Sequence, residues 1–135
     1  MSFELRSHTA DIAVEATAET LGDTFAAVAA GLSAAHCDSI PDGNSPFSIT
    51  LTAESREGLL FDYLDELIYQ RDIRDVLPTN HQVSIEESRT LSLEATADGI
   101  PLAEIDAREI KAVTYSEMEL EQTPSGWRAY VVFDV

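Results

Sequence analysis

Acidic groups near the two ends of the 135-residue sequence have the chemistry of metal ligands. Asp11 closes the segment His8-Thr9-Ala10-Asp11, and Asp134 directly precedes Val135, whose α-carboxylate ends the sequence. Two unit charges about 4 Å apart repel each other by roughly 4 kcal/mol at an effective dielectric constant of about 20. If the fold brings these three carboxylates together, a cation must accompany them, either a divalent ion or Lys111, the only lysine.

Carboxylate oxygens are hard donors, which favour Mg²⁺, Ca²⁺ or Mn²⁺ over zinc. Asp11 has the opposite parity to Ile12 and Val14 in a predicted strand, and Asp134 has the opposite parity to Phe133. Because side chains alternate between the faces of a strand, both aspartates are expected to point away from the core. The alternative is that each is an ordinary solvated residue at the end of a strand.

Two further residues near this site have two interpretations each. Lys111 is either an ordinary surface lysine or an ammonium that neutralises the carboxylates or binds a phosphate. His8, three residues before Asp11, is either a plain turn residue or a side chain that orients the Asp11 carboxylate. No pair of nucleophile and base can be identified, and Cys37 is expected to be a small buried hydrophobic residue.

The composition indicates which class of protein this is and which partners it is expected to bind. Twenty-five acidic residues against eight basic ones give a net charge of -17, while 44% of the residues are hydrophobic and periodic in sequence. This combination predicts a folded protein adapted to molar salt, where the screening length falls to about 3 Å. A chain without a cluster of basic residues is not expected to bind nucleic acid directly. The single cysteine suits a reducing cytoplasm. The lack of a leader and of an apolar run of about 18 residues predicts a protein that does not enter membranes. Together with the acidic composition, these features predict a cytoplasmic, halophilic protein.

The apolar periodicity predicts seven strands and two helices. The expected segments are strands over 3–5, 12–16, 47–51, 83–85, 91–95, 110–121 and 127–134, a helix from the cap Thr20 to near His36, and a helix after the cap Ser55. Loops are expected at 38–46, at Asp98-Gly99 with Pro101, and at 123–126. A change of parity predicts a bulge or break near Ser116.

This order of elements describes a single α+β domain over residues 1–135. Two helices are expected to pack on one face of a mainly antiparallel sheet. Each half of the sequence contains strand, helix and strand, which is compatible with a degenerate duplication.

Four segments together resemble the archease family. They are HTADI at 8–12, LLFDYLDELIYQRD at 59–72, IKAVTY at 110–115 and GWRAYVVFDV at 126–135. They occur in the family's order and span nearly the whole chain.

The resemblance implies a two-layer α+β sandwich of duplicated strand-helix-strand-strand units. It also implies a chaperone-like protein cofactor that is not an enzyme. Archeases activate the tRNA-splicing RNA ligase by promoting its guanylylation and its multiple turnover. Carried over to this chain, the family's divalent ion, assigned as calcium, would be bound by Asp11, Asp134 and Val135, and the lysine of the family's KAVTY motif is Lys111.

This sequence departs from the family pattern at three positions. One is a histidine common some residues upstream of the lysine, in whose place this chain has acidic and small residues. Ser116 stands where KAVTY is often followed by histidine, so no role can be given to that imidazole, and Ala13 replaces the usual glycine after HTADI. Two other functions remain open: a metal-dependent phosphoester hydrolase that uses Asp11 and Asp134, and a ligand-binding module or general chaperone.

Overall fold

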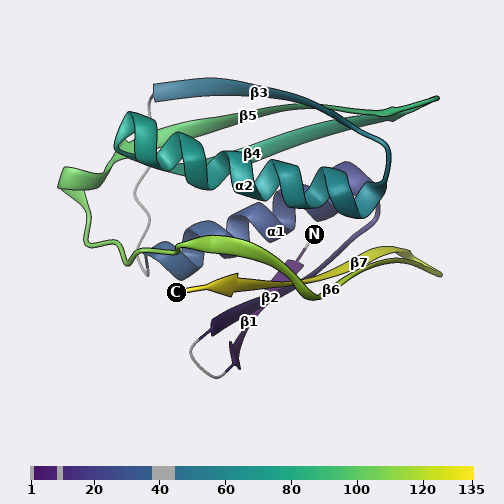
Figure 1. The fold of residues 1–135 in the computed structure, drawn as a ribbon, viewed down its shortest axis with the longest axis horizontal. Helices are drawn as coiled ribbons and strands as arrows, with labels where there is room; N and C mark the ends of the chain where they lie inside the picture. The colour runs from purple at the N-terminus through teal and green to yellow at the C-terminus, as the bar shows by residue number, and fades with distance from the viewer. Residues whose placement is uncertain (1, 9–10, 38–44) are drawn as a thin grey trace.

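The computed structural model describes residues 2–8, 11–37 and 45–135, and it places two helices between two antiparallel sheets (Figure 1). The helices are α1 (Leu21–His36) and α2 (Arg56–Arg74). The strands are β1 (Ser2–His8), β2 (Asp11–Ala18), β3 (Ser45–Ala53), β4 (Val76–Glu87), β5 (Leu91–Pro101), β6 (Ala112–Thr123) and β7 (Gly126–Asp134), and one 3₁₀ turn (Leu102–Glu104) follows β5.

The strands are divided between a four-stranded sheet and a three-stranded sheet. The four-stranded sheet has the order β1-β2-β7-β6, and the three-stranded sheet has the order β3-β5-β4. The expected α+β class, with two helices on antiparallel strands, is confirmed. The single sheet of the sequence analysis is replaced by two, because the alternation of a strand shows which residues are buried but not which partner strand lies beside it.

Helix α1 is buried almost all round, since both sheets pack against it. Its N-cap is Thr20, whose hydroxyl accepts a hydrogen bond from the Asp23 amide at 3.1 Å. Small residues let both sheets approach closely: a Cβ added to Gly22 would lie 2.6 Å from the Val83 carbonyl oxygen of β4, and one added to Gly31 would lie 2.5 Å from Val14 of β2. A helix with this all-round burial has to be rich in alanine and glycine.

Helix α2 has one broad apolar stripe and one solvent-facing side. Its N-cap is Ser55, whose hydroxyl accepts from the Gly58 amide at 3.0 Å, and its C-cap is Asp75 in the left-handed conformation, with φ 54°. The buried positions recur three and four residues apart, as expected for an amphipathic helix; they are Leu59, Leu60, Tyr63, Leu64, Leu67, Ile68 and Arg71. Both predicted caps are therefore confirmed. Neither described helix is long and apolar enough to cross a bilayer.

Three local predictions can be compared with the strands. The loop expected at Asp98-Gly99 and Pro101 is wrong, because β5 continues through these residues and pairs with β4 over its whole length. The irregularity near Ser116 is confirmed: the register of β6 with β7 shifts between Thr114 and Glu119, and Glu117 has φ 61°. Most of the loop predicted at 38–46 lies outside the described residues, while its last two residues belong to β3.

Candidate functional site

Asp11 and Asp134 lie opposite each other on the two central strands of the four-stranded sheet. Asp11 begins β2, Asp134 ends β7, and the two are Cα partners in the β2–β7 ladder. Directly opposed residues of an antiparallel pair project their side chains from the same face, with Cβ atoms about 4.5–5.5 Å apart. The fold therefore places these two aspartates opposite each other, a position that the sequence alone left open.

The two aspartates occupy the outer face of the sheet, away from the helices. The residues next to them, Ile12 and Phe133, are Cα partners that belong to the hydrophobic core or pack against it. Asp11 is half-buried and Asp134 is exposed. The parity prediction for both aspartates is thus correct.

Val135 holds the end of β7 in place. Its side chain is half-buried and packs against the core cluster, which continues the alternation of Ala129, Val131 and Phe133. The side chain of Val135 faces the helices. Its main chain therefore continues β7 directly beyond Asp134. The C-terminus in Figure 1 lies at the same end of the sheet as the start of β6.

Lys111 contacts Asp134 through the backbone. The Lys111 amide donates a hydrogen bond to the Asp134 carbonyl oxygen at 2.8 Å, and the Lys111 side chain is exposed. The residue directly opposite Asp134 on β6 is Ala112. Lys111 therefore precedes by one residue the position that is directly opposite Asp134. The main-chain hydrogen bond places Lys111 next to the site.

The remaining members of the HTAD segment are described only in part. His8 is the Cα partner of Asp11 in the β1–β2 ladder, so its backbone lies in the same row across the sheet. The predicted role of His8 in orienting the carboxylate depends on its side chain, which lies outside the described part of the structure, as do Thr9 and Ala10.

Arg128 binds three carboxylates farther along the same outer face. Its guanidinium contacts Glu15 at 2.6 Å, Glu119 at 2.9 Å and Glu121 at 3.3 Å. Hydrogen bonds to Glu119 and Glu15 raise the pKa of Arg128 above its usual range. At about 3.4 Å per residue, Arg128 lies roughly 20 Å from Asp134 along β7, too far to neutralise the aspartate pair. Arg128 alternates in phase with Asp134 along β7, but no pattern in the sequence identifies its three partners.

A buried pair of cation and imidazole joins the two helices. Arg71 of α2 donates to Nε2 of His36 at 2.6 Å, and Nδ1 of His36 donates to the Leu32 carbonyl oxygen at 2.9 Å. This arrangement requires a neutral imidazole, and burial lowers the pKa of His36 to about 4. The signal that would have identified Arg71 is its position on the apolar stripe of α2.

The donor set of Asp11 and Asp134 suits a hard divalent cation. Among the described residues, no group of three or more His, Cys, Asp or Glu side chains is arranged to hold a metal ion. From the part of the chain that the structure describes, any further ligand at the aspartate pair would therefore be a main-chain oxygen, and solvent or a partner could supply others. Two opposed carboxylates and main-chain oxygens fit Ca²⁺ or Mg²⁺ and do not fit zinc.

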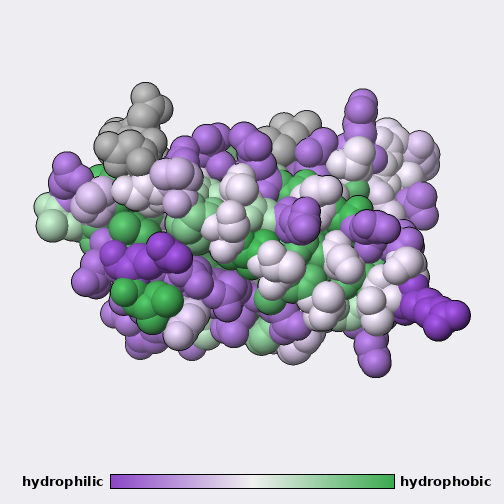
Figure 2. Space-filling model, turned by 90° about the horizontal axis from the view of Figure 1, so that it is seen from above, coloured by the Kyte–Doolittle hydropathy of each residue, from purple (hydrophilic) through white to green (hydrophobic). Residues whose placement is uncertain are grey.

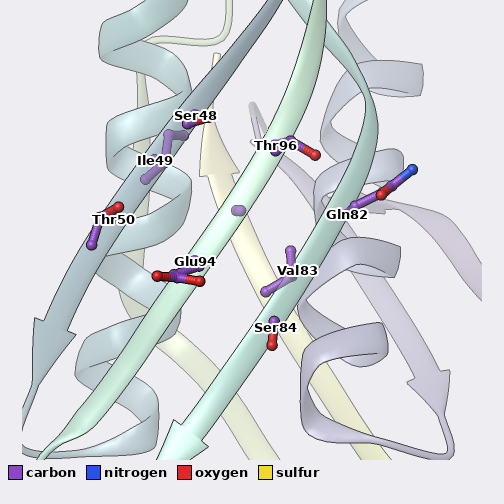
Figure 3. A pocket seen from close by; sticks show the side chains of 9 residues that line it. Ser48, Ile49, Thr50, Gln82, Val83, Ser84, Glu94 and Thr96 are labelled. Atoms are coloured by element: carbon purple, nitrogen blue, oxygen red, sulfur yellow. The ribbon is translucent and has the colours of Figure 1, made fainter.

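The outer face of the three-stranded sheet has a different character. A shallow hollow of about 570 Å³ is lined there by short polar side chains of the three strands (Figure 3); they are Ser48, Thr50, Gln82, Ser84, Glu94 and Thr96, over Ile49, Val83 and Ala95. Figure 2, a view from this side, shows mostly purple and near-white atoms with green between them. Glu94 is the only ionisable residue in this lining, so the aspartate pair is the better candidate for binding a cation.

Known proteins resemble this chain over nearly its whole length. A sequence model of the Archease protein family (MTH1598/TM1083) matches residues 3–135. Protein archease of Methanosarcina mazei is 36% identical over 139 residues, which cover 98% of this chain and 95% of the relative. Protein archease of Pyrococcus abyssi is 32% identical over 143 residues, covering 98% of each.

Solved structures show the same fold. The solution structure of Methanobacterium thermoautotrophicum protein 1598 superposes with a TM-score of 0.86 at 30% identity, covering 98% of both chains. The crystal structure of TM1083 from Thermotoga maritima, described as an archease and possible chaperone, has a TM-score of 0.65 at 22% identity and covers 96% of this chain and 94% of its own. The matches in sequence and fold run nearly end to end, and this chain belongs to the archease family.

Proposed function

We propose that this chain is a protein activator of a tRNA-splicing RNA ligase and does not join RNA itself. Its role would be to promote guanylylation of the ligase and so to permit multiple turnover. Membership of the archease family supports this function, together with the resemblance of its four motifs.

The observation that carries the proposal is the opposition of Asp11 and Asp134 across the β2–β7 ladder. The HTADI motif and the C-terminal motif are at the two ends of the sequence, and the sheet joins them in one row. The IKAVTY motif meets the same row through the hydrogen bond between Lys111 and Asp134. Three of the four motifs thus contribute to one end of one sheet.

A divalent ion, calcium by the family resemblance, would be held by Asp11, Asp134 and the α-carboxylate of Val135. It would supply positive charge that neutralises the crowded carboxylates. The residues of the chain would keep these oxygens in place: the β2–β7 ladder opposes the two aspartates, and the packing of Val135 on the core fixes the last peptide unit.

The acidic outer face would dock beside the ligase's own catalytic centre. Enzymes that transfer nucleotides bind phosphates with cationic side chains and metal ions. A surface that carries five carboxylates and one guanidinium is complementary to such a positively charged site. These carboxylates are Asp11, Glu15, Glu119, Glu121 and Asp134, with Arg128 among the glutamates. Electrostatic complementarity of this kind speeds association and fixes the orientation of the partner.

The test is ligation of a splicing intermediate by a cognate ligase, under conditions in which substrate exceeds enzyme. The wild-type chain should raise the number of turnovers and the guanylylated fraction of the ligase, and Asp11→Asn should remove this effect. Glu94→Gln, which removes one exposed carboxylate from the other sheet, is the matched control. An unchanged rate with the wild-type chain would contradict the proposal, and hydrolysis of phosphoesters by the chain alone would support the alternative hydrolase.

A further inference from the structure

Three large apolar side chains are exposed on or beside one side of α2. Tyr69 and Ile73 are each 55% exposed, and Tyr115 of β6 is 57% exposed. Tyr115 stacks on Phe61 of α2, with ring centroids 4.1 Å apart and planes inclined by 3°. Phe61, Tyr69 and Ile73 belong to one ladder of positions four residues apart, which also contains the exposed Asp65. Each step of four turns about 40° around the helix, so the ladder crosses the solvent-facing side of α2 from the side next to β6. We call Phe61, Tyr69, Ile73 and Tyr115 the aromatic row.

The neighbouring row of α2 is polar and internally hydrogen-bonded. Gln70 donates to Glu66 at 2.6 Å, and Arg74 donates to Gln70 at 2.6 Å. Arg74 also lies over the Phe47 ring of β3, with its guanidinium carbon 4.8 Å from the ring centroid. The side of α2 next to β3 is thus covered by polar groups, whereas Tyr69 and Ile73 are exposed on the solvent-facing side of the helix. Figure 1 shows α2 in full along the front of the helical layer.

The aromatic row consists of two apolar pairs, Phe61 with Tyr115 and Tyr69 with Ile73, on either side of the exposed Asp65. Isolated exposed apolar side chains are normal, whereas contiguous ones mark interaction sites. Tyrosine is also among the residues that contribute most to the affinity of protein interfaces, because it buries a large area with few rotatable bonds.

Charge identifies the kind of partner. Asp62, Asp65 and Asp72 of α2 are exposed around the aromatic row, and the chain as a whole carries -17. A second copy of this chain would bring the same negative charge to the contact and be repelled. The complementary surface is a protein segment with an apolar or aromatic centre flanked by Lys or Arg.

We propose that the aromatic row is a docking surface for a basic, apolar segment of the ligase. This inference rests on the proposed function and adds a second contact to it. The row lies on the helical layer, whereas Asp11 and Asp134 lie on the outer face of the four-stranded sheet. Docking through the aromatic row therefore determines how tightly the partner is held, and the aspartate pair determines whether it is activated.

The experiment measures binding and activation separately. Binding of the purified ligase is followed by isothermal titration calorimetry, and activation is the ligation rate at saturating concentrations of the chain. Tyr69→Gln with Ile73→Gln should weaken binding by roughly tenfold or more, while the rate at saturation stays at the wild-type value. Both residues are exposed, so thermal unfolding should be unchanged. Thr50→Gln with Thr96→Gln, at exposed positions of the three-stranded sheet, is the matched control.

A second pair of variants tests the charge argument. Asp62→Asn with Asp65→Asn should weaken binding, most strongly at low salt, whereas Glu54→Gln with Glu94→Gln removes the same charge elsewhere and should have a smaller effect. Wild-type affinity in the Tyr69/Ile73 variant would overturn the docking surface and leave the proposed function intact. Binding without activation by the wild-type chain would overturn the proposed function alone. No binding by the wild-type chain, or a wild-type dimer that the Tyr69/Ile73 variant loses, would overturn the assignment of the partner.

Discussion

Asp11 of β2 and Asp134 of β7 are directly opposed across the two central strands of the four-stranded sheet, on the face away from the helices. The pair joins residues from the two ends of the sequence. It brings like charges together without contributing to the apolar core, and this arrangement is the basis of the first two predictions.

Replacing either aspartate should remove cation binding without unfolding the protein. We expect Asp11→Asn and Asp134→Asn to reduce the affinity for Ca²⁺ roughly tenfold or more, because hard cations depend on the number of charged oxygen ligands. In the absence of metal, the melting temperature should stay the same or rise, since a repulsion has been removed. Calorimetric titration with CaCl₂ and thermal unfolding in a chelator measure the two effects. Wild-type affinity in both variants would contradict the proposed site.

A C-terminal extension should act like loss of a ligand. Adding Gly-Ser after Val135 converts its α-carboxylate into a peptide carbonyl, and we expect weaker Ca²⁺ binding and reduced stimulation of ligation. The same two residues placed at the N-terminus are the control. Full stimulation by the C-terminally extended chain would show that this carboxylate is not a ligand.

Stability should fall with pH below about 6.5 because two imidazoles are buried in the neutral form. Burial lowers the pKa of both His36 and His81 to about 4. The folded state therefore binds fewer protons than the unfolded state between pH 6.5 and 4. The stability from these groups is complete above pH 6.5 and is lost as the pH falls towards 4, by up to about 1.4 kcal/mol per pH unit for each histidine.

Urea unfolding at pH 7.5, 6 and 5 measures this slope. His36→Gln removes one titrating group, so its stability should depend less on pH than that of the wild type. Equal stability of the wild type at pH 7.5 and pH 5 would rule out this coupling.

Alanine at Gly22 should destabilise the protein although alanine favours helices. The new Cβ would lie 2.6 Å from the Val83 carbonyl oxygen, a backbone atom that cannot move without disturbing β4. We expect a loss of about 1–3 kcal/mol in the free energy of unfolding. Gly58→Ala is the comparison: its Cβ would meet only the Ser55 hydroxyl, at 2.8 Å, and its loss should not exceed the roughly 1 kcal/mol of an N-cap. Equal stability of Gly22→Ala and the wild type would disprove the close packing of α1 on β4.

Removing Arg128 should destabilise the protein mainly at low salt. Arg128→Met leaves Glu15, Glu119 and Glu121 without their shared cation, and we expect a loss of about 1–3 kcal/mol near 0.1 M salt. In molar salt, where the screening length is about 3 Å, the loss should shrink. Arg56→Met breaks the exposed pair with Glu87 and the contact of the guanidinium with the Trp127 ring, and it should lose less stability than Arg128→Met. Denaturant unfolding at both salt concentrations distinguishes the variants, and a loss at Arg128 that does not depend on salt would contradict its electrostatic origin.

The sequence predicts the helices well because their signals are local. Thr20 and Ser55 are typical N-caps followed by apolar residues at helical spacing, and both caps form the expected hydrogen bonds. The division into two sheets is not a local property. The sequence of α1 nevertheless contains one signal for two sheets. A helix whose side chains are small and apolar on every side has to be covered on both sides.

Tertiary pairing also overrides turn propensity in β5. Asp98 and Gly99 suggest a turn, yet they pair with β3 on one side and β4 on the other. Gly99 is needed there because a Cβ would lie 3.0 Å from the Val76 side chain. For the site, strand parity correctly placed Asp11 and Asp134 on the outer face, while their register with each other followed from the pairing of β2 with β7, which no local pattern encodes.

The position of β7 between β2 and β6 has a consequence for the order of folding. β7 is the last described strand to be synthesised, yet it occupies an interior place in its sheet, next to one of the first. The helices and the three-stranded sheet consist of segments that leave the ribosome earlier, whereas the four-stranded sheet closes only when β7 inserts. Until then β2 has an unpaired edge on the side of β7, and Asp11 lacks its partner Asp134 on that side. The two aspartates therefore meet only in a completely folded molecule, so a truncated or partly folded chain cannot present the pair to a partner.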